Sequence, residues 1–548
     1  MRRWQYFSRI HRPHALGVGL AVVIASCIWL GGVADAANWT MAGQNISNSR
    51  AQPEERLITA ANVVKLAPRW VFRTHGNVSA TPTVSKGIVY FPDYGGYLYA
   101  VSARTGRLIW QRPISQYDGN PNGFSRVSPA IFGNEVVVGD DFHEDHAGGA
   151  HMFAVNRFTG QLLWSTQVDG HSAAHITSNP VIAAGKAIVG VSSEEEDDSL
   201  GVDYPCCTFR GSVVALNATT GSLLWKTYTV PPNSGPCQHG NPPEGCGYSG
   251  GAVWSTPAVS LLTHTVYAAT GNNYTVPDQA EQCHEAAVES EASDAGCTAP
   301  DDYFDSVLAL NLDTGVIRWG HKVEGWDATN SACDFKKIGV TWCPSAESPD
   351  FDFGGGGPNI FTINGRTVVG AGQKSGIYWV FNAATGEIVW DTLVGPGTAA
   401  GGIEWGTSYD GRRIYVPIAD PEEFGVPYKL ANGEPASGGS WAALNPATGA
   451  FDWQVATPGD GAAIGPTTEA DGVVFAGTYV VGEDNMFALD ASSGRLRWAF
   501  HAQGTVNSGP SVVDGTVYWG SGYPGSIRGY STRLYAFSIP GSTAPIQP

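Results

Sequence analysis

The sequence has few charged residues, and positively charged side chains are the scarcest of them. Lys and Arg total 31 against 50 Asp and Glu, which gives a formal net charge of −19 over 548 residues. This excess of negative charge argues against nucleic acid or an anionic membrane surface as a partner. A solvated acidic surface or the docking of a basic partner remain as interpretations.

A motif for haem attachment is missing, and no segment after the N-terminal region is apolar and long enough to span a bilayer. The chain contains no CxxCH motif, which excludes a covalently attached c-type haem, and no CxxC metal spacing. Its long apolar run follows Arg2 and Arg3 and ends before "ADA" at 34–36, which predicts a signal peptide over residues 1–36. The mature chain, residues 37–548, is then one periplasmic or secreted domain. A lipoprotein anchored at Cys27, in "IASC", is the alternative.

Eight cysteines follow the predicted signal peptide, and an even count in an exported chain predicts disulfides. Neighbouring cysteines can pair in sequence order, as Cys206–Cys207, Cys237–Cys246, Cys283–Cys297 and Cys333–Cys343. The first pair, in "YPCCTF", is adjacent in the chain. It is interpreted as two free thiols, as partners of distant cysteines or as a strained ring.

Glycine and tryptophan are abundant, and both belong to a repeat. The chain has 70 Gly and 18 Trp, and seven segments combine an apolar strand, a Thr-Gly or Ser-Gly turn and a closing Trp. Glycine allows the positive φ of the turn, and the Trp is expected to pack between neighbouring units. The segments end at Trp110, Trp164, Trp225, Trp319, Trp390, Trp453 and Trp498.

An eighth copy, "LYAFSIPG" at 534–541, lacks its Trp strand, and "LAPRWVFRT" around Trp70 supplies one from the other end of the chain. The pattern therefore predicts an all-β fold, an eight-bladed β-propeller closed by the N-terminal strand. The longest insertions are predicted to form the walls of a cavity at one mouth of the propeller. These insertions are residues 192–210, 230–250, 274–303 and 326–357.

The repeat resembles the tryptophan-docking motif of pyrroloquinoline quinone (PQQ)-dependent alcohol dehydrogenases. Within that family, "YPCCTFRGSVVALNATTG", "MAGQNISNSR" and "FSRVSPA" are most similar to polyvinyl-alcohol dehydrogenases. The resemblance implies an exported enzyme that oxidises polyvinyl alcohol or another secondary alcohol by hydride transfer to PQQ bound with Ca²⁺. Electrons would pass to an external acceptor, a cytochrome c, because the chain has no haem motif.

The resemblance also assigns the base and the metal ligands. Asp327, in "EGWDATN", would be the general base, and Thr329 stands where lanthanide-using relatives carry an additional Asp. Calcium prefers carboxylate and amide oxygens. The implied metal ligands are Glu195, Asn272 and Asp327, with Glu194 and Glu196 as alternatives to Glu195.

A planar polyanion such as PQQ requires stacking surfaces and cationic or amide donors. The resemblance places Cys206–Cys207 against the quinone, opposite the floor residue Trp254, whereas the alternative is a loop staple without cofactor contact. The implied cofactor contacts are Trp254, Arg126, Thr177, Lys374, Cys206, Cys207, Glu404 and Trp405.

Two other functions fit parts of the sequence. A non-catalytic propeller, similar to outer-membrane assembly lipoproteins, would explain the repeats and Cys27. A PQQ-dependent sugar dehydrogenase would explain the cofactor residues, although such enzymes usually lack adjacent cysteines. Ser79 departs from the Glu that many relatives carry there.

Overall fold

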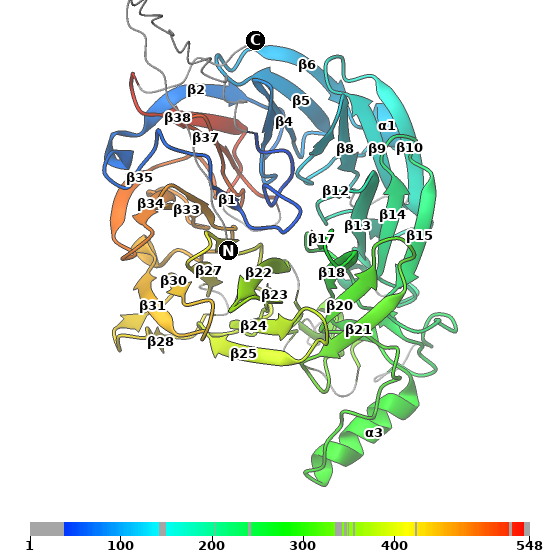
Figure 1. The fold of residues 1–548 in the computed structure, drawn as a ribbon. Coiled ribbons are helices and arrows are strands. Elements are labelled where there is room, and N and C mark those ends of the chain that lie inside the picture. The colour runs from blue at the N-terminus through cyan, green and yellow to red at the C-terminus, as the bar shows by residue number, and fades with distance from the viewer. Residues whose placement is uncertain are drawn as a thin grey trace, which may run out of the picture. The chain divides into compact units, whose positions relative to one another are not determined.

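Eight antiparallel sheets stand around a central axis in the computed structural model (Figure 1). The structure describes residues 38–141, 149–201, 203–238, 243–334, 342–344, 348, 350–353, 357–421, 425–524 and 529–541. The predicted signal peptide, with Cys27, lies outside these residues. The eight-bladed propeller predicted from the Trp repeat is confirmed.

Each blade is a meander whose first strand is nearest the axis and whose fourth strand is at the rim. Blades one to four consist of β3 (Thr83–Ser85), β4 (Ile88–Pro92), β5 (Tyr97–Ser102), β6 (Leu108–Pro113); β7 (Ala130–Phe132), β8 (Glu135–Gly139), β9 (Ala150–Asn156), β10 (Leu162–Asp169); β12 (Val181–Ala183), β13 (Lys186–Ser193), β14 (Ser212–Asn217), β15 (Leu223–Tyr228); and β17 (Ala258–Ser260), β18 (Thr265–Ala269), β20 (Ser306–Asn311), β21 (Ile317–Lys322). Blades five to eight consist of β22 (Asn359–Ile363), β23 (Arg366–Gly372), β24 (Ile377–Asn382), β25 (Ile388–Leu393); β26 (Ser408–Tyr409), β27 (Ile414–Ala419), β30 (Gly439–Leu444), β31 (Phe451–Ala456); β32 (Thr468–Ala470), β33 (Val473–Gly477), β34 (Met486–Asp490), β35 (Leu496–Phe500); and β36 (Ser511–Val513), β37 (Thr516–Ser521), β38 (Arg533–Ser538), β2 (Ala67–Arg73).

The ring closes through β2, which comes from the N-terminal part of the chain. It pairs antiparallel with β38 from Ala67 opposite Ser538 to Arg73 opposite Arg533. Figure 1 shows these two strands, blue and red, side by side. This pairing covers the edge of β38, and the closed ring leaves only short, protected sheet edges.

The repeated tryptophans join one blade to the next. The indole Nε1 of Trp110 donates to the carbonyl of Arg157 at 2.9 Å, and Trp498 donates to Leu66 at 2.9 Å, which completes the circle. Gly160 has φ 69° and lies under the Trp110 ring, where an added Cβ would be 2.7 Å from the ring carbon Cε3. The Thr-Gly turn is therefore required twice, for its left-handed backbone and for space. The same indole-to-carbonyl bond is made by Trp70, Trp164, Trp225, Trp319, Trp390 and Trp453.

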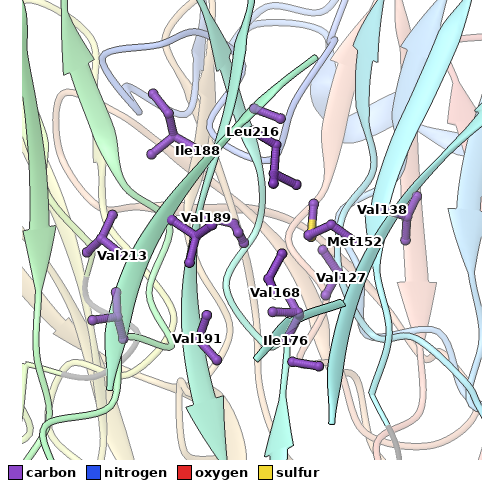
Figure 2. Close-up of a cluster of buried hydrophobic side chains, with 14 of the residues drawn as sticks. Val127, Val138, Met152, Val168, Ile176, Ile188, Val189, Val191, Val213 and Leu216 are labelled. Carbon is purple, nitrogen blue, oxygen red and sulfur yellow. The ribbon is translucent and has the colours of Figure 1, made fainter. Parts of the chain in front are cut away.

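The core consists of aliphatic side chains that interdigitate between blades. Figure 2 shows Val138 and Met152 of blade two together with Ile188, Val189 and Val191 of blade three, all of them members of one cluster of buried side chains. Because each sheet is covered on both faces, strands such as β13 are buried on both faces, and residues 187–191 of that strand carry no polar side chain. Removing a large side chain here costs about 2–5 kcal/mol.

The segment 39–52 crosses the ring and pairs with the first strands of several blades. The carbonyl of Thr40 accepts from Ile131, and the carbonyl of Ile46 accepts from Val259. Gln52 reaches blade eight, where its Nε2 donates to Val512 at 3.0 Å. Further carbonyls of this segment accept from blades five to seven, at Ile360, Tyr409 and Glu469.

The chain also forms short helices, 3-10 turns and strands outside the four-stranded meanders. The helices are α1 (Ser115–Asp118), α2 (Glu195–Asp198), α3 (Asp278–Glu289) and α4 (Ser331–Asp334), with 3-10 turns η1 (Val63–Lys65) and η3 (Pro458–Asp460). The additional strands are β1 (Ala51–Gln52), β11 (Ala174–His175), β16 (Ser249–Gly250), β19 (Asn273–Thr275), β28 (Tyr428–Lys429) and β29 (Pro435–Ala436). Within the described parts of the chain, no helix combines the length and apolar character that crossing a bilayer requires.

Candidate active site

A cavity of about 1270 Å³ opens where the loops of one face of the propeller meet. In a four-stranded meander, the loop after the second strand and the loop that leaves the fourth strand emerge on the same face. The lining residues come from both places: Ser192 lies at the end of β13, Lys374 follows β23, and Arg126 and Trp254 lie between blades. The insertions expected to form the walls supply part of the lining.

Seven of the predicted cofactor and metal residues line this cavity. Glu194 and Glu196, the alternatives to Glu195, also line it, whereas Glu195, Asp327 and the Cys206–Cys207 pair do not. The seven are Arg126, Thr177, Trp254, Asn272, Lys374, Glu404 and Trp405.

Two tryptophans and two cations form one end of the cavity. The rings of Trp254 and Trp405 meet edge to face, with centroids 5.0 Å apart and an interplanar angle of 67°. The Nζ atom of Lys374 is 5.6 Å from the Trp254 ring, and the guanidinium of Arg126 is 5.4 Å from the Trp405 ring. Both contacts lie within the range of cation–π attraction.

Carboxylates surround Lys374. Its Nζ is 2.8 Å from Asp350 and 3.5 Å from Asp352, and Trp254 Nε1 donates to Asp352 at 3.1 Å. Burial lowers the pKa of Lys374, but these carboxylates reverse the effect and raise it well above its ordinary value. Burial raises the pKa of Glu404, which also faces Lys374, to about 8.

Glu195 and Glu196 are neighbours in α2, but their carboxylates lie in different environments. The Glu195 carboxylate is fully buried outside the cavity and accepts from the N–H groups of Thr208 (2.7 Å) and Phe209 (2.6 Å). Glu196 lines the cavity, where Asn272 Nδ2 donates to it at 3.3 Å. Burial raises the pKa of Glu196 to about 8.

All four sequential disulfides are formed, as predicted. Cys206 and Cys207 are fully buried in the blade-three core. Their carbonyls accept from Cys237 N–H at 3.0 Å and from Asn233 Nδ2 at 3.2 Å. Contact of this disulfide with the cofactor stays a prediction, with the loop staple as its alternative.

Asp327 lies one layer behind the cavity wall and is 2% exposed. Its carboxylate accepts from the Phe351 N–H at 2.7 Å and from the Ser348 hydroxyl. Burial raises the pKa of Asp327, while these two hydrogen bonds favour its ionised form. Asp327 therefore fixes the turn that carries Asp350 and Asp352, and Asp352 is the residue of that turn which lines the cavity.

Backbone hydrogen bonds join the loop of Asp327 to the loop of Asn272. The Asn273 N–H donates to the Asp327 carbonyl at 3.0 Å, and the Thr329 N–H donates back to the Asn273 carbonyl at 2.9 Å. Asn272 Nδ2 donates to the Thr329 carbonyl at 2.9 Å. The loops that carry Asn272 and Asp327 are therefore one rigid unit.

Several wall residues of the cavity were not predicted from the sequence. Asp352 stands in "PDFDF" within the insertion 326–357, where two acidic residues before a glycine run were the available signal. His175 Nδ1 is 2.9 Å from Asp141 and 3.2 Å from Glu194, and Arg126 Nε is 3.0 Å from Asp141. A further part of the wall, also unpredicted, comes from blades six and seven and includes Val426, Pro427, Ile464, Val480 and Val481.

Several known proteins are similar to this chain. The sequence profile of a family described as outer membrane protein assembly factor BamB matches residues 51–202, 209–457 and 437–538. A polyvinylalcohol dehydrogenase of a Pseudomonas species is 30% identical, over 92% of this chain and 77% of its own length. One from Sphingopyxis sp. (strain 113P3) is 29% identical over the same shares.

Solved structures share the fold. A quinohemoprotein alcohol dehydrogenase of Pseudomonas putida HK5 has a TM-score of 0.67 at 21% identity, covering 93% of this chain and 81% of its own. A europium-containing methanol dehydrogenase has a TM-score of 0.63 at 17% identity, covering 92% and 98%.

The fold and its cavity define a class, the tryptophan-docked eight-bladed propellers with a charged, aromatic pocket at one mouth. This architecture and the 30% identity over 92% of the chain together show the family to which the chain belongs. It belongs to the PQQ-dependent alcohol dehydrogenase family, whose members are oxidoreductases that act on CH–OH groups.

Proposed function

We propose that this protein is an exported, calcium- and PQQ-dependent dehydrogenase that oxidises a secondary alcohol. The observation that carries the proposal is the joint position of Trp254, Trp405, Arg126 and Lys374 at one end of a single cavity. A flat, polyanionic cofactor requires this combination of aromatic surface and positive charge.

The carboxylates around the cavity fit a divalent cation. Asp352 influences Glu196, Asp305 and Asp327 electrostatically, and Lys374 is the cation beside Glu196 and Asp352. No N–H or hydroxyl group of the described residues reaches either oxygen of Asp305, whose pKa burial and the Asp327 carboxylate raise well above its usual range. Such surplus buried negative charge is stabilised by a hard cation.

Glu196 and Asn272 would hold the metal from blades three and four, with the Asp327–Asp352 unit facing them from the next loop. This assignment replaces Glu195 by the neighbouring Glu196, because the Glu195 carboxylate accepts two backbone N–H groups away from the cavity. When bound, PQQ and Ca²⁺ supply the hydride acceptor and the Lewis acid that polarises it.

Oxidation of an alcohol also requires a base that takes the hydroxyl proton. The resemblance implies Asp327, but the geometry favours Asp352, because its carboxylate lines the cavity beside Trp254 and Lys374. Asp327 then acts through the Phe351 hydrogen bond, which holds the turn of Asp352 in place.

The size of the cavity and the apolar part of its wall support a bulky substrate. A cavity of about 1270 Å³ exceeds the roughly 300–1,000 Å³ of a typical ligand pocket. The apolar side chains of Val426, Val480 and Val481 leave room beside the charged end for a hydrocarbon chain. Because two relatives are named polyvinylalcohol dehydrogenases, polyvinyl alcohol is the first substrate to test.

The electron acceptor is proposed to be a separate cytochrome c. The chain has no CxxCH motif, and its net charge of −19 favours docking of a basic protein. Export by the predicted signal peptide would place the enzyme in the periplasm, or outside the cell.

Reconstitution tests the proposal. Purified apoprotein is incubated with PQQ and Ca²⁺, and dye reduction is followed with polyvinyl alcohol, short secondary alcohols and glucose. Alcohol-dependent turnover that requires both additions supports the function. No turnover together with no retained quinone absorbance would instead favour the non-catalytic scaffold suggested by the assembly-factor profile, and activity restricted to glucose would favour a sugar dehydrogenase.

Two variants test which carboxylate, that of Asp352 or that of Asp327, acts as the base. Asp352→Asn should abolish turnover while the protein keeps PQQ, and Asp327→Asn should retain a reduced rate, because an asparagine oxygen still accepts from Phe351. The reverse ranking would return the role of base to Asp327.

A further inference from the structure

Helix α3 and the turn after it contact the backbone immediately before Asp327. The helix (Asp278–Glu289) is part of the insertion in blade four and is clamped to the following turn by the Cys283–Cys297 disulfide. Figure 1 shows α3 standing out from the ring beside β20 and β21. A helix that projects from a propeller contributes little to its core, so the notable contact of α3 is the one with the loop before Asp327.

At that contact, His284 stacks on Trp326. The ring centroids are 4.3 Å apart and the planes differ by 16°. His284 Nδ1 is 2.8 Å from Asp294 Oδ2, which fixes the imidazole. Trp326 is 9% exposed and clusters with Val276 and Ala280. The indole is therefore held between the imidazole and the first residues of the insertion that carries α3.

Asp294 also restrains the residue before Trp326. A Cβ added to Gly325 would lie 2.2 Å from Asp294 Oδ1, so the backbone at Gly325 passes directly against that carboxylate. Helix α3 and the turn after it therefore contact both Gly325 and Trp326, the two residues that precede Asp327. On its other side, Asp327 is bonded through its carbonyl to the Asn273 N–H at 3.0 Å.

The contacts continue from Asp327 to the cavity. Its carboxylate accepts from the Phe351 N–H at 2.7 Å, and the next residue, Asp352, lines the cavity and accepts from Trp254. A displacement of Trp326 would move Asp327, and through it the turn of Asp352. A misplacement of about 1 Å at a reacting group costs roughly 100-fold in rate.

We propose that His284 is a positioning residue for the dehydrogenase, which fixes Trp326 and thereby holds the Asp327–Asp352 unit at the cavity. The inference rests on the proposed function. His284 is not among the residues that line the cavity, so it acts through Trp326 and not on substrate or cofactor. The stacked ring is the essential feature, which distinguishes His284→Ala from His284→Phe.

The test compares His284→Ala, His284→Phe and a control, Gln282→Ala, at an exposed position of the same helix. Amide hydrogen exchange of the apoprotein, PQQ affinity, kcat and KM are measured for each. His284→Ala should accelerate exchange in residues 324–328 and 350–353 and lower kcat about tenfold or more, with PQQ affinity and KM within about twofold of the unaltered protein. His284→Phe should restore most of kcat, and Gln282→Ala should change neither measurement.

Several results would overturn the inference. Unchanged exchange and kcat in His284→Ala would show that the stack restrains nothing. Equal losses in His284→Ala and His284→Phe, or a loss of PQQ binding and melting temperature in parallel with kcat, would indicate a general structural role. If the unaltered protein has no PQQ-dependent turnover, the proposed function fails, and the exchange data for the apoprotein still decide whether His284 restrains residues 324–328.

Discussion

Trp254 and Trp405 meet edge to face at 5.0 Å, and each lies within cation–π distance of one cation, Lys374 for Trp254 and Arg126 for Trp405. The two indoles come from loops of blades three to four and five to six, so the contact crosses the cavity mouth and does not lie within one blade. Aromatic pairs of this geometry contribute about 0.5–1.5 kcal/mol beyond the area they bury. Cofactor affinity should therefore depend on both rings together.

Trp405→Ala should weaken PQQ binding by about tenfold to a hundredfold, because it removes an aromatic surface and the partner of Arg126. Trp405→Phe keeps a ring and should lose less than half of that free energy. Binding is measured by quenching of intrinsic fluorescence during titration of the apoprotein with PQQ in excess Ca²⁺. Equal affinities for the alanine and phenylalanine variants would place Trp405 outside the cofactor contact.

Substitution of Glu196 should weaken calcium binding, whereas substitution of Glu195 should lower the stability of the fold. Glu196→Ala should raise the Ca²⁺ concentration for half-maximal activation by about tenfold to a hundredfold with little change in melting temperature. Glu195→Ala leaves the Thr208 and Phe209 N–H groups buried without their acceptor and should cost about 2 kcal/mol of unfolding free energy. Calcium titrations and urea melts of both variants check this. A calcium defect confined to Glu195→Ala would restore the sequence-based assignment.

These two glutamates show what the sequence could and could not predict. The Trp repeat specified the fold because the turn Gly and the Trp stand at a fixed short spacing within each copy, and the Trp of one copy packs on the Gly of the next, as Trp110 does on Gly160. Residues one position apart on a helical turn point about 100° apart, so an acidic run such as 194–196 does not say which carboxylate faces a cavity.

Loop residues were harder still. Asp352 and Val426 lie in insertions without repeat periodicity, and their direction depends on contacts with distant loops, as the Asp327–Phe351 hydrogen bond shows. By contrast, Trp254, Asn272 and Lys374 lie directly next to blade strands, and the register of those strands carried them to the predicted cavity.

The disulfides should differ sharply in their accessibility to reductant. Cys283 is exposed on α3, whereas Cys206 and Cys207 are fully buried. Mild reductant followed by alkylation of the folded protein should label Cys283 and Cys297 first, with Cys206 and Cys207 protected until unfolding. Peptide mass spectrometry against time measures the order. Early labelling of Cys207 would mean that its loop opens in the native state, which would favour a contact with the cofactor over a buried staple.

Glu469 should make the propeller less stable as pH rises. Burial is the main cause that raises its pKa from 4.5 to about 8, while the Gly472 N–H donates to it at 2.8 Å. The folded state therefore binds this proton more tightly than the unfolded state does. The contribution to stability is fully present below about pH 4.5 and is lost at up to about 1.4 kcal/mol per pH unit until pH 8, above which it is constant.

Glu469→Gln isolates this effect, because glutamine keeps the acceptor for Gly472 and cannot ionise. The variant and the unaltered protein should have equal unfolding free energies near pH 4.5, and the variant should be the more stable by a few kcal/mol at pH 8. Urea melts at half-unit pH steps measure the difference, in which every other titrating group cancels. Parallel curves for the two proteins would mean that Glu469 ionises in the folded state near its ordinary pKa, with water or Arg412 compensating its charge.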